Sequence, residues 1–324
     1  MPMSTAKKHH FVPQFVLRRF AIAGTQQLHV FDKQTGRAFK ANIADVAAEN
    51  RLYDFSIGEW IATIEPSLAD FESKAAAVLQ GILAADSLTS LALYDRVVLA
   101  VLIAQLLLRS PHQRAVTRDM TSQLRSHVER MGTDPDTVPQ LKVFDDNEEK
   151  QFTVRILDNL AREFAPIIAT KCWVLHSAPD NLGLYVSDNP VAMHNELDAG
   201  PRGNLGLGVL GVEVYCPLTS GRCLGMYCPT VRDELDHAYD GYLARTRSRD
   251  GREQPLPEVA AQMFESFRTG QISPLTEESV EFMNSLQVWN AERFVFSSSG
   301  DFDLARKIVE RNPALRTGPR PRTG

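Results

Sequence analysis

The sequence predicts an α+β fold, in which a mainly antiparallel sheet is surrounded by helices and one helix is largely buried. Three observations predict this fold class. Short β-rich segments bounded by Gly, Pro, Asn and Asp occur around 28–40 and again within 170–228. Stretches with apolar residues at helical spacing separate these segments and follow them. The run 97–108 is apolar on almost every face, which is typical of a helix inside a core.

The N-terminal half is expected to form a hairpin followed by helices. The segment 28–40, LHVFDKQTGRAFK, has strand composition on both sides of a Gly-containing turn, and NRLYDF, 50–55, is a further short strand candidate. Over 65–82 apolar residues recur at helical spacing, with a proline in the first turn. The next helix contains the apolar run and either ends near Ser110 and Pro111 or continues there after a kink, because proline interrupts a helix interior.

The C-terminal half is expected to supply most of the sheet. A Pro- and Asp-rich linker, 132–147, precedes a helix over 148–166, and β-rich segments with a period of two follow it. These strand candidates are TKCWVLHSA, LGLYVSD, VLGVEVYCPL and RCLGMYC. The later elements are helices over 233–245, 258–268, 276–289 and 302–310, with a short strand over 293–298.

The chain is expected to fold as a single domain. Its 324 residues, 44% of them hydrophobic, are enough for one large core. We therefore expect one elaborated α+β domain over 1–311, since no internal repeat divides it. The polar, Pro- and Arg-rich segment 312–324 is expected to be a disordered tail.

Charge, cysteine content and hydropathy narrow the class of protein. A net charge of -5 argues against a surface that binds nucleic acid or anionic lipid as a whole, while a local basic patch stays compatible with it. The four cysteines match neither a metal site nor a secreted disulfide framework. No leader with an apolar core opens the chain, and the run 97–108 is too short to span a bilayer. The expected localisation is cytoplasmic, with no membrane partner.

Two adjacent histidines, His9 and His10, precede an apolar segment in KKHHFVPQFVLRRF, 7–20. In an extended segment successive side chains face opposite ways, so one histidine can face a site while its neighbour faces the core or solvent. The apolar residues that follow would fix the imidazole in place, which suits metal ligation or proton transfer. The alternative is one hydrogen-bonded structural histidine and one exposed histidine.

The segment YVSDNPV, 185–191, places short polar side chains at the end of a strand candidate. Pro190 stops the strand and keeps Asn189 out of the helical region. Asp188 is then a candidate metal ligand or general base, with Asn189 beside it. The alternative is an Asx turn, in which Asp188 accepts hydrogen bonds from nearby backbone amides.

Arg109 directly follows the apolar run, in LLRSPHQR. If it points into the fold, it can pair with Asp188 or bind an anionic substrate through two parallel hydrogen bonds. Glu72 lies in an otherwise apolar, Ala-rich helix and can share a helical face with Glu65, which makes it a further candidate carboxylate. A solvated surface position is the alternative for Glu72.

Five motifs occur in order over 9–298, and together they resemble the domain of unknown function 4238 family. The motifs are HHFVPQFVLRRF, LLRSPHQR, YVSDNPV, CPLTS and NSLQVWNAERFVFS. The first and third are the most specific, because they combine rare residues in a fixed order. The chain departs from the family pattern at Val16, where an aromatic residue is more common, and at Ser220, which follows PLT where proline is frequent. The resemblance implies no established reaction, so the chemistry is argued from the residues.

The first functional hypothesis is a metal-dependent hydrolase, with a phosphodiesterase or nuclease as the specific candidates. Its catalytic candidates are His10, Asp188, Arg109 and Asn189, and the candidate ligands of a divalent metal cofactor are His9, His10, Asp188 and Glu72. The expected substrate is a small anion or a nucleic acid. Familiar nucleotide-binding and hydrolase motifs are missing from the sequence.

The second hypothesis is a non-catalytic ligand-binding or sensor module, in which the same groups recognise a small anion or form a buried structural network. A third is nucleic-acid binding through Arg114, Arg118 and Arg125, which lie on one helical face but are usually solvated in such a pattern. The acidic net charge disfavours this third hypothesis. The sequence leaves the substrate, the metal and the oligomeric state open.

Overall fold

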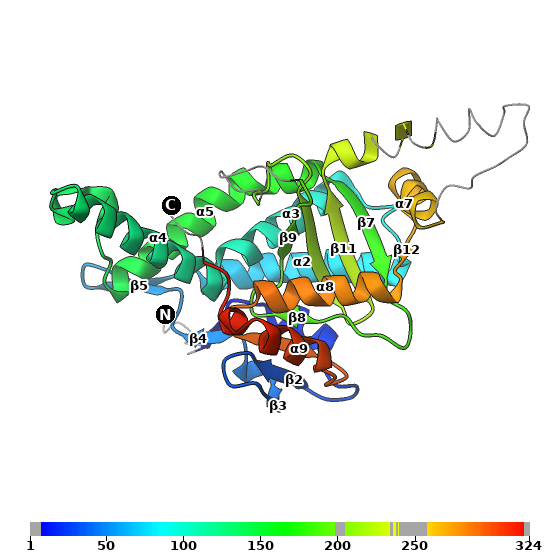
Figure 1. The fold of residues 1–324 in the computed structure, drawn as a ribbon, viewed down its shortest axis with the longest axis horizontal. Coiled ribbons are helices and arrows are strands. Elements are labelled where there is room, and N and C mark those ends of the chain that lie inside the picture. The colour runs from blue at the N-terminus through cyan, green and yellow to red at the C-terminus, as the bar shows by residue number, and fades with distance from the viewer. Residues whose placement is uncertain (1–7, 198–204, 234–235, 238, 240–257, 321–324) are drawn as a thin grey trace, which may run out of the picture.

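The structure, a computed structural model, describes residues 8–197, 205–233, 236–237, 239 and 258–320. It confirms the predicted α+β class, with helices around mostly antiparallel sheets (Figure 1). Most of the predicted helix over 233–245 lies outside the described residues.

One layer is a five-stranded sheet formed by the central part of the chain. Its strands are β7 (Cys172–Ser177), β9 (Ala192–His194), β10 (Glu213–Thr219), β11 (Arg222–Tyr227) and β12 (Ser273–Pro274). They are arranged in the order β12–β7–β11–β10–β9. All neighbours pair antiparallel except β12, which adds a short parallel edge to β7.

A second sheet joins both ends of the chain. Its strands are β2 (Gln27–Asp32), β3 (Arg37–Asn42), β8 (Val186–Ser187) and β13 (Phe294–Ser297). The order β3–β2–β13–β8 places the predicted N-terminal hairpin beside the C-terminal strand. The remaining described strands form two two-stranded sheets. β1 (Lys8–His10) pairs with β4 (Ala48–Asn50), and β5 (Asp54–Ile57) pairs with β6 (Trp60–Thr63).

The helices follow the predicted order. The α-helices are α1 (Gln14–Leu17), α2 (Glu65–Ala85), α3 (Leu93–Leu108), α4 (Pro111–Arg130), α5 (Asp146–Thr170), α7 (Glu258–Thr269), α8 (Glu277–Asn290) and α9 (Asp303–Arg311). Short 3-10 turns are η1 (Arg18–Phe20), η2 (Ile43–Asp45), η3 (Pro135–Thr137), η4 (Pro139–Leu141) and η6 (Pro313–Arg316). The predicted linker between α4 and α5 therefore contains two ordered turns.

Helices cover both faces of the five-stranded sheet. In β7, Trp173 and Leu175 pack into the main core with α2, α3 and α5, whereas Val174 packs with α7 and α8. Successive side chains of a strand face opposite ways, so a strand covered on both faces has no polar alternation. Figure 1 shows α8 on the near side of the sheet and α2 and α3 behind it.

The apolar run forms the buried helix that the sequence predicts. α3 lies between α2 and α5, and the consecutive residues Val98, Leu99 and Ala100, which point in different directions around the helix, are all buried. Among the described residues, no helix combines the length and the apolar content needed to cross a bilayer.

Three predicted elements differ from the structure. The short strand expected over 50–55 is replaced by a turn over 51–53, which joins the end of β4 at Asn50 to the start of β5 at Asp54. The strand expected over 182–188 is reduced to β8, because the Asn284 side chain, and not a neighbouring strand, bonds the backbone of Gly183 and Tyr185. α5 continues beyond its expected end through Pro166 to Thr170. Burial of Ile168 against the core offsets the backbone hydrogen bond that proline removes.

The segment predicted as a tail, 312–324, is described as far as Arg320. This part contains η6 and packs against the domain. Leu315 is buried, and the Arg316 guanidinium donates to the Gln34 carbonyl oxygen at 2.7 Å.

Candidate functional site

The segment Ser187–Pro190, the Asp188 corner, is held by the inward face of α8. Gln287 accepts from Ser187 Oγ at 2.9 Å and donates to the Pro190 carbonyl at 2.8 Å. Asn290 donates to the Asn189 carbonyl at 3.0 Å, and Asn189 Nδ2 donates back to the Asn290 carbonyl at 3.0 Å. Side chains three residues apart on one helix thus replace the strand partners that this corner lacks.

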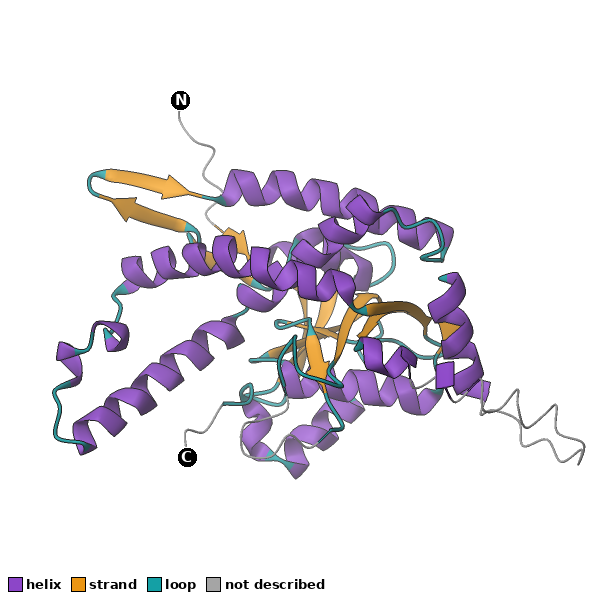
Figure 2. Cartoon of the chain, turned by 90° about the horizontal axis from the view of Figure 1, so that it is seen from above, coloured by secondary structure: helices purple, strands orange, loops and turns teal. Residues whose placement is uncertain are grey.

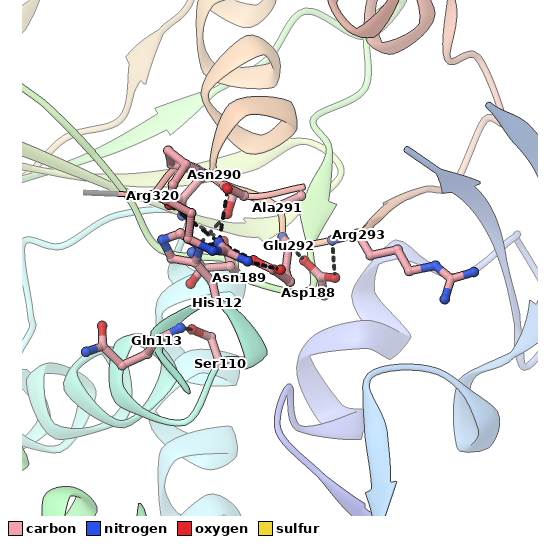
Figure 3. Close-up of polar contacts among 12 residues, drawn as sticks. Ser110, His112, Gln113, Asp188, Asn189, Asn290, Ala291, Glu292, Arg293 and Arg320 are labelled. Atoms are coloured by element: carbon pink, nitrogen blue, oxygen red, sulfur yellow. Dashed lines mark hydrogen bonds and ion pairs between the residues drawn. The ribbon is translucent and has the colours of Figure 1, made fainter. Parts of the chain in front are cut away.

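The Asp188 carboxylate is fully buried and binds three consecutive backbone amides. It accepts from the N–H groups of Glu292, Arg293 and Phe294, each at 2.8 Å. Figure 3 shows Asp188 beside Glu292 and Arg293. Burial raises its pKa to about 6, although these three hydrogen bonds and nearby Lys33 favour the charged form. Asp188 therefore ties the end of β8 to the connection between α8 and β13.

Lys33 completes this corner from the N-terminal hairpin. Its ammonium group is buried and donates to the carbonyls of Val288 and Ala291, both at 2.6 Å, at the C-terminal end of α8. These are carbonyls that a helix end leaves without partners. Burial lowers the pKa of Lys33 to about 8, while Asp188 and Glu292 oppose this shift.

Arg109 lies in a separate group of contacts, the Arg109 cluster, with Glu72, Tyr53, Glu65 and His9. Its buried guanidinium donates from Nη2 to Glu72 Oε1 at 2.8 Å. Arg109 Nε and Nη1 and the Tyr53 hydroxyl are buried without hydrogen-bond partners in the described part of the chain. Burial lowers the pKa of Arg109, but Tyr53 and Glu72 outweigh it and leave the pKa above its ordinary value.

His9 contacts Tyr53, and Glu65 lies within electrostatic range of His9 and Arg109. His9 Nδ1 accepts from the Tyr53 N–H at 3.1 Å, the two rings stack with centroids 5.7 Å apart, and His9 Nε2 is 3.7 Å from Asp54 Oδ1. Burial raises the pKa of Glu65, which His9 lowers and Glu72 raises. The cluster therefore combines two neighbouring carboxylates, an imidazole and a buried cation.

The two histidines face different surroundings. His9 is buried in the Arg109 cluster, whereas His10 is half-buried and its Nε2 lies 3.3 Å from the Ile43 carbonyl oxygen. Burial lowers the pKa of His10, and the Ile43 carbonyl opposes this shift. The separation follows from the strand geometry of β1.

The predicted site residues thus divide into two groups. His9, Glu72 and Arg109 come together, while Asp188 and Asn189 contact α8 and the start of β13. Arg109 pairs with Glu72 and not with Asp188. Among the described residues, no three His, Cys, Asp or Glu side chains are placed to hold a metal ion.

Sequence reasoning did not single out Tyr53, Lys33 or Gln287. Tyr53 was assigned only to a short strand, and Lys33 precedes a turn, where an exposed lysine is usual. The spacing of Gln287 from Asn284 and Asn290 places all three on one helix face, and this was the signal available for Gln287.

A cleft lies between α4 and α5, near the Arg109 cluster. Its volume is about 440 Å³, and Figure 2 shows the two helices and the loop that joins them. It is lined by the cations Arg114, Arg118, Arg125 and Lys142, by α4 hydroxyls, and by Leu108, Phe144, Phe152 and Ile156. The Phe144 and Phe152 rings lie 5.1 Å apart.

Arg114 connects this α4–α5 cleft to the Arg109 cluster. It forms an ion pair with Glu49 and donates to the Arg109 carbonyl oxygen at 3.2 Å. Glu49 is the cross-strand neighbour of His9 in the β1–β4 pair. The inner end of the cleft is therefore fixed by residues that also build the cluster.

Comparison with known proteins supports the resemblance read from the motifs. Residues 8–301 match a family described as a protein of unknown function (DUF4238). The chain belongs to this family. No curated protein and no solved structure matches it. In this DUF4238 chain the first and third motifs supply His9 to the Arg109 cluster and Asp188 to the corner at α8.

Asp188→Asn is expected to lower the free energy of unfolding by about 2–4 kcal/mol, because an amide offers one acceptor oxygen to three buried N–H groups. The stability difference is measured by urea denaturation at pH 7. Asp70→Asn, at an exposed position on α2, is the control and should change little.

The same variant also tests the raised pKa of Asp188. Between pH 3.8 and about 6 the folded protein keeps a proton that the unfolded chain releases, so this group makes stability fall as pH rises through that window. Asp188→Asn should remove this contribution from the pH profile. Identical pH slopes for the two proteins would contradict the assignment.

Glu72→Gln is expected to cost about 2–4 kcal/mol of unfolding free energy, because it leaves the buried Arg109 charge without its partner. The double variant Arg109→Met with Glu72→Met should cost less than Glu72→Gln, since no buried charge then remains unpaired. Asp158→Asn, which breaks an exposed pair on α5, is the matched control. A double variant less stable than Glu72→Gln would argue against this account.

Proposed function

We propose that this protein is a binding module for a small anionic ligand with an aromatic or apolar body, held in the α4–α5 cleft. The cleft itself is the observation that carries the proposal. Cationic side chains and a pair of phenylalanine rings both line it. A concave site with a few convergent polar groups is the usual form of a ligand-binding site.

The charge of the lining favours an anion. Four cationic side chains line the cleft, Arg114, Arg118, Arg125 and Lys142, against the two carboxylates Glu129 and Glu149. Arginine binds carboxylate and phosphate groups through two parallel hydrogen bonds, which lysine cannot do.

All four cations are already in ion pairs, Arg114 with Glu49, Arg118 with Glu149, Arg125 with Asp136 and Lys142 with Glu148. In each pair one side chain is exposed, so a ligand anion would compete with these carboxylates. Arg118 pairs with Glu149 at 2.7 Å, but its side chain is 62% exposed. Such surface pairs contribute little stability, so a ligand anion can replace the carboxylate at small cost. Arg125 is oriented by the Leu141 carbonyl at 2.8 Å, which keeps its guanidinium in place when its exposed partner Asp136 is displaced.

The aromatic pair favours a ligand with an apolar body. Phe144 and Phe152 lie opposite the cationic face of α4, and Phe144 is 39% exposed. Burying a ring against them adds hydrophobic free energy to the ionic contacts. The Arg109 cluster then supports the site by fixing Arg114 at its inner end.

1-Naphthyl phosphate is the probe that tests this proposal, with binding followed by calorimetry. Arg118→Gln and Phe152→Leu are each expected to weaken binding by roughly five- to tenfold, because one removes a charged hydrogen bond and the other an aromatic contact. Arg162→Gln, at an exposed position on α5, is the control for loss of one positive charge.

Inorganic phosphate and 1-naphthol separate the two contributions, and each should bind more weakly than 1-naphthyl phosphate. Unchanged affinity in both cleft variants would remove the α4–α5 cleft as the binding site.

A hydrolase is the second candidate, and it is supported by the Arg109 cluster. Glu65 has a raised pKa beside His9 and Arg109, which is the environment of a general acid next to a group that binds negative charge. The donor arrangement among the described residues does not fit a metal ion, so the acid–base groups carry this candidate. A metal-dependent reaction through His10, Asp188 and Asn189 stays a prediction.

Release of nitrophenol from bis(p-nitrophenyl) phosphate tests the hydrolase candidate, with and without added Mg²⁺ or Mn²⁺. Glu65→Gln is expected to lower the rate by roughly a hundredfold if Glu65 transfers the proton. Glu277→Gln, exposed at the start of α8, is the control. A rate equal in Glu65→Gln and wild type would exclude Glu65 as the acid.

A further inference from the structure

The chain beyond α9 returns to the start of α4. This segment, 313–320, is called the C-terminal strap. Leu315 anchors it in the domain, and Arg316 bonds the Gln34 carbonyl in the turn between β2 and β3. Arg320 then reaches the first turns of α4 and the residue that follows Ala291, as Figure 3 shows.

Arg320 binds a set of polar groups from two elements. Its guanidinium contacts both Glu292 oxygens, with Nη2 at 2.5 Å from Oε1 and Nη1 at 2.9 Å from Oε2. Its Nε lies 3.0 Å from Asp119 Oδ2, and Nη1 lies 3.3 Å from His112 Nδ1. Glu292 is only 17% exposed, so the two-pronged ion pair is partly shielded from water.

The strap backbone fits this place closely. A Cβ on Gly318 would lie 2.7 Å from Glu292 Oε2 and closer still to His112 Nδ1. The Gly318 carbonyl accepts from Arg320 Nη1 at 2.9 Å, which orients the guanidinium from its own segment. In this contact the pKa of Glu292 falls to about 2, because burial, which raises it, is outweighed by the hydrogen bonds and charges of His112 and Arg320.

We infer that His112, Asp119 and Glu292 form an arginine-binding site, the arginine notch, whose occupant is Arg320 of the same chain. The C-terminal strap thereby fastens the N-terminal half of α4 to the connection between α8 and β13. The planar fork of arginine matches the two Glu292 oxygens, and a lysine would supply a single point of contact.

This attachment has a consequence for α4. All residues of α4 are described, and none of them is fully buried, so packing alone stabilises this helix weakly. One side of α4 carries His112 and Asp119 of the notch, and the other side carries Arg114 and Arg118 of the cleft. Release of Arg320 should therefore loosen a wall of the α4–α5 cleft.

Amide hydrogen exchange of the full-length chain tests the inference without any ligand, so its outcome is independent of the proposed function. Arg320→Ala is expected to speed exchange over 114–122 by roughly fivefold or more, with Arg320→Lys between Arg320→Ala and wild type. Gly318→Ala should act like Arg320→Ala, because it keeps the charge but blocks the fit.

Two controls separate the notch from general effects. Arg311→Ala removes an exposed positive charge at the end of α9, and Gly221→Ala adds a methyl group where no atom lies within 4 Å. Both should leave exchange in α4 unchanged. Equal acceleration in α3 and α4, or wild-type exchange in Arg320→Ala, would overturn the inference.

Discussion

The bond between Asp188 and three consecutive backbone amides is the interaction on which the rest of the structure depends. β8 belongs to the four-stranded sheet and β9 to the five-stranded sheet, and Asp188 lies in the short connection between them. The carboxylate holds the start of β13 against it, so one buried charge fixes the relative position of α8 and both sheets. An uncompensated carboxylate there would be costly, and the three N–H groups offset part of that cost, since burial still raises the pKa of Asp188 to about 6.

The Arg109 cluster likewise compensates a buried charge, in this case the guanidinium of Arg109. Arg109 directly follows the last residue of the apolar helix α3 and is buried with it, so its charge is shielded from water. Glu72 on α2 supplies the opposite charge, and Tyr53 and His9 close the site from the N-terminal strands. This network links α2, the C-terminal end of α3 and the N-terminal strands, so it restricts how they shift relative to one another. Through the Arg109 carbonyl oxygen it also positions Arg114 at the edge of the α4–α5 cleft.

Residue spacing was enough to predict which segments are polar and where they occur, but not which of them meet. SDNP was expected to present polar groups at a strand end, and an Asx-like use of Asp188 was one of the two alternatives considered for it. The amides that Asp188 binds lie about a hundred residues further along the chain, in Glu292, Arg293 and Phe294. Arg109 was expected to pair with Asp188 or to bind an anionic substrate, and its partner in the structure is Glu72, which the sequence could not reveal because both residues offer the same carboxylate.

The sequence by itself determined the α+β class, the order of helices and strands, the buried helix and the family, because periodicity and motif order are local properties of the chain. Only the tertiary structure decided that His9 and Asp188 lie in different groups, that α4 and α5 enclose a cleft, and that Arg320 returns to α4. These outcomes depend on which distant surfaces pack together. Packing is settled by the shape and charge of the whole core, and no single segment encodes it.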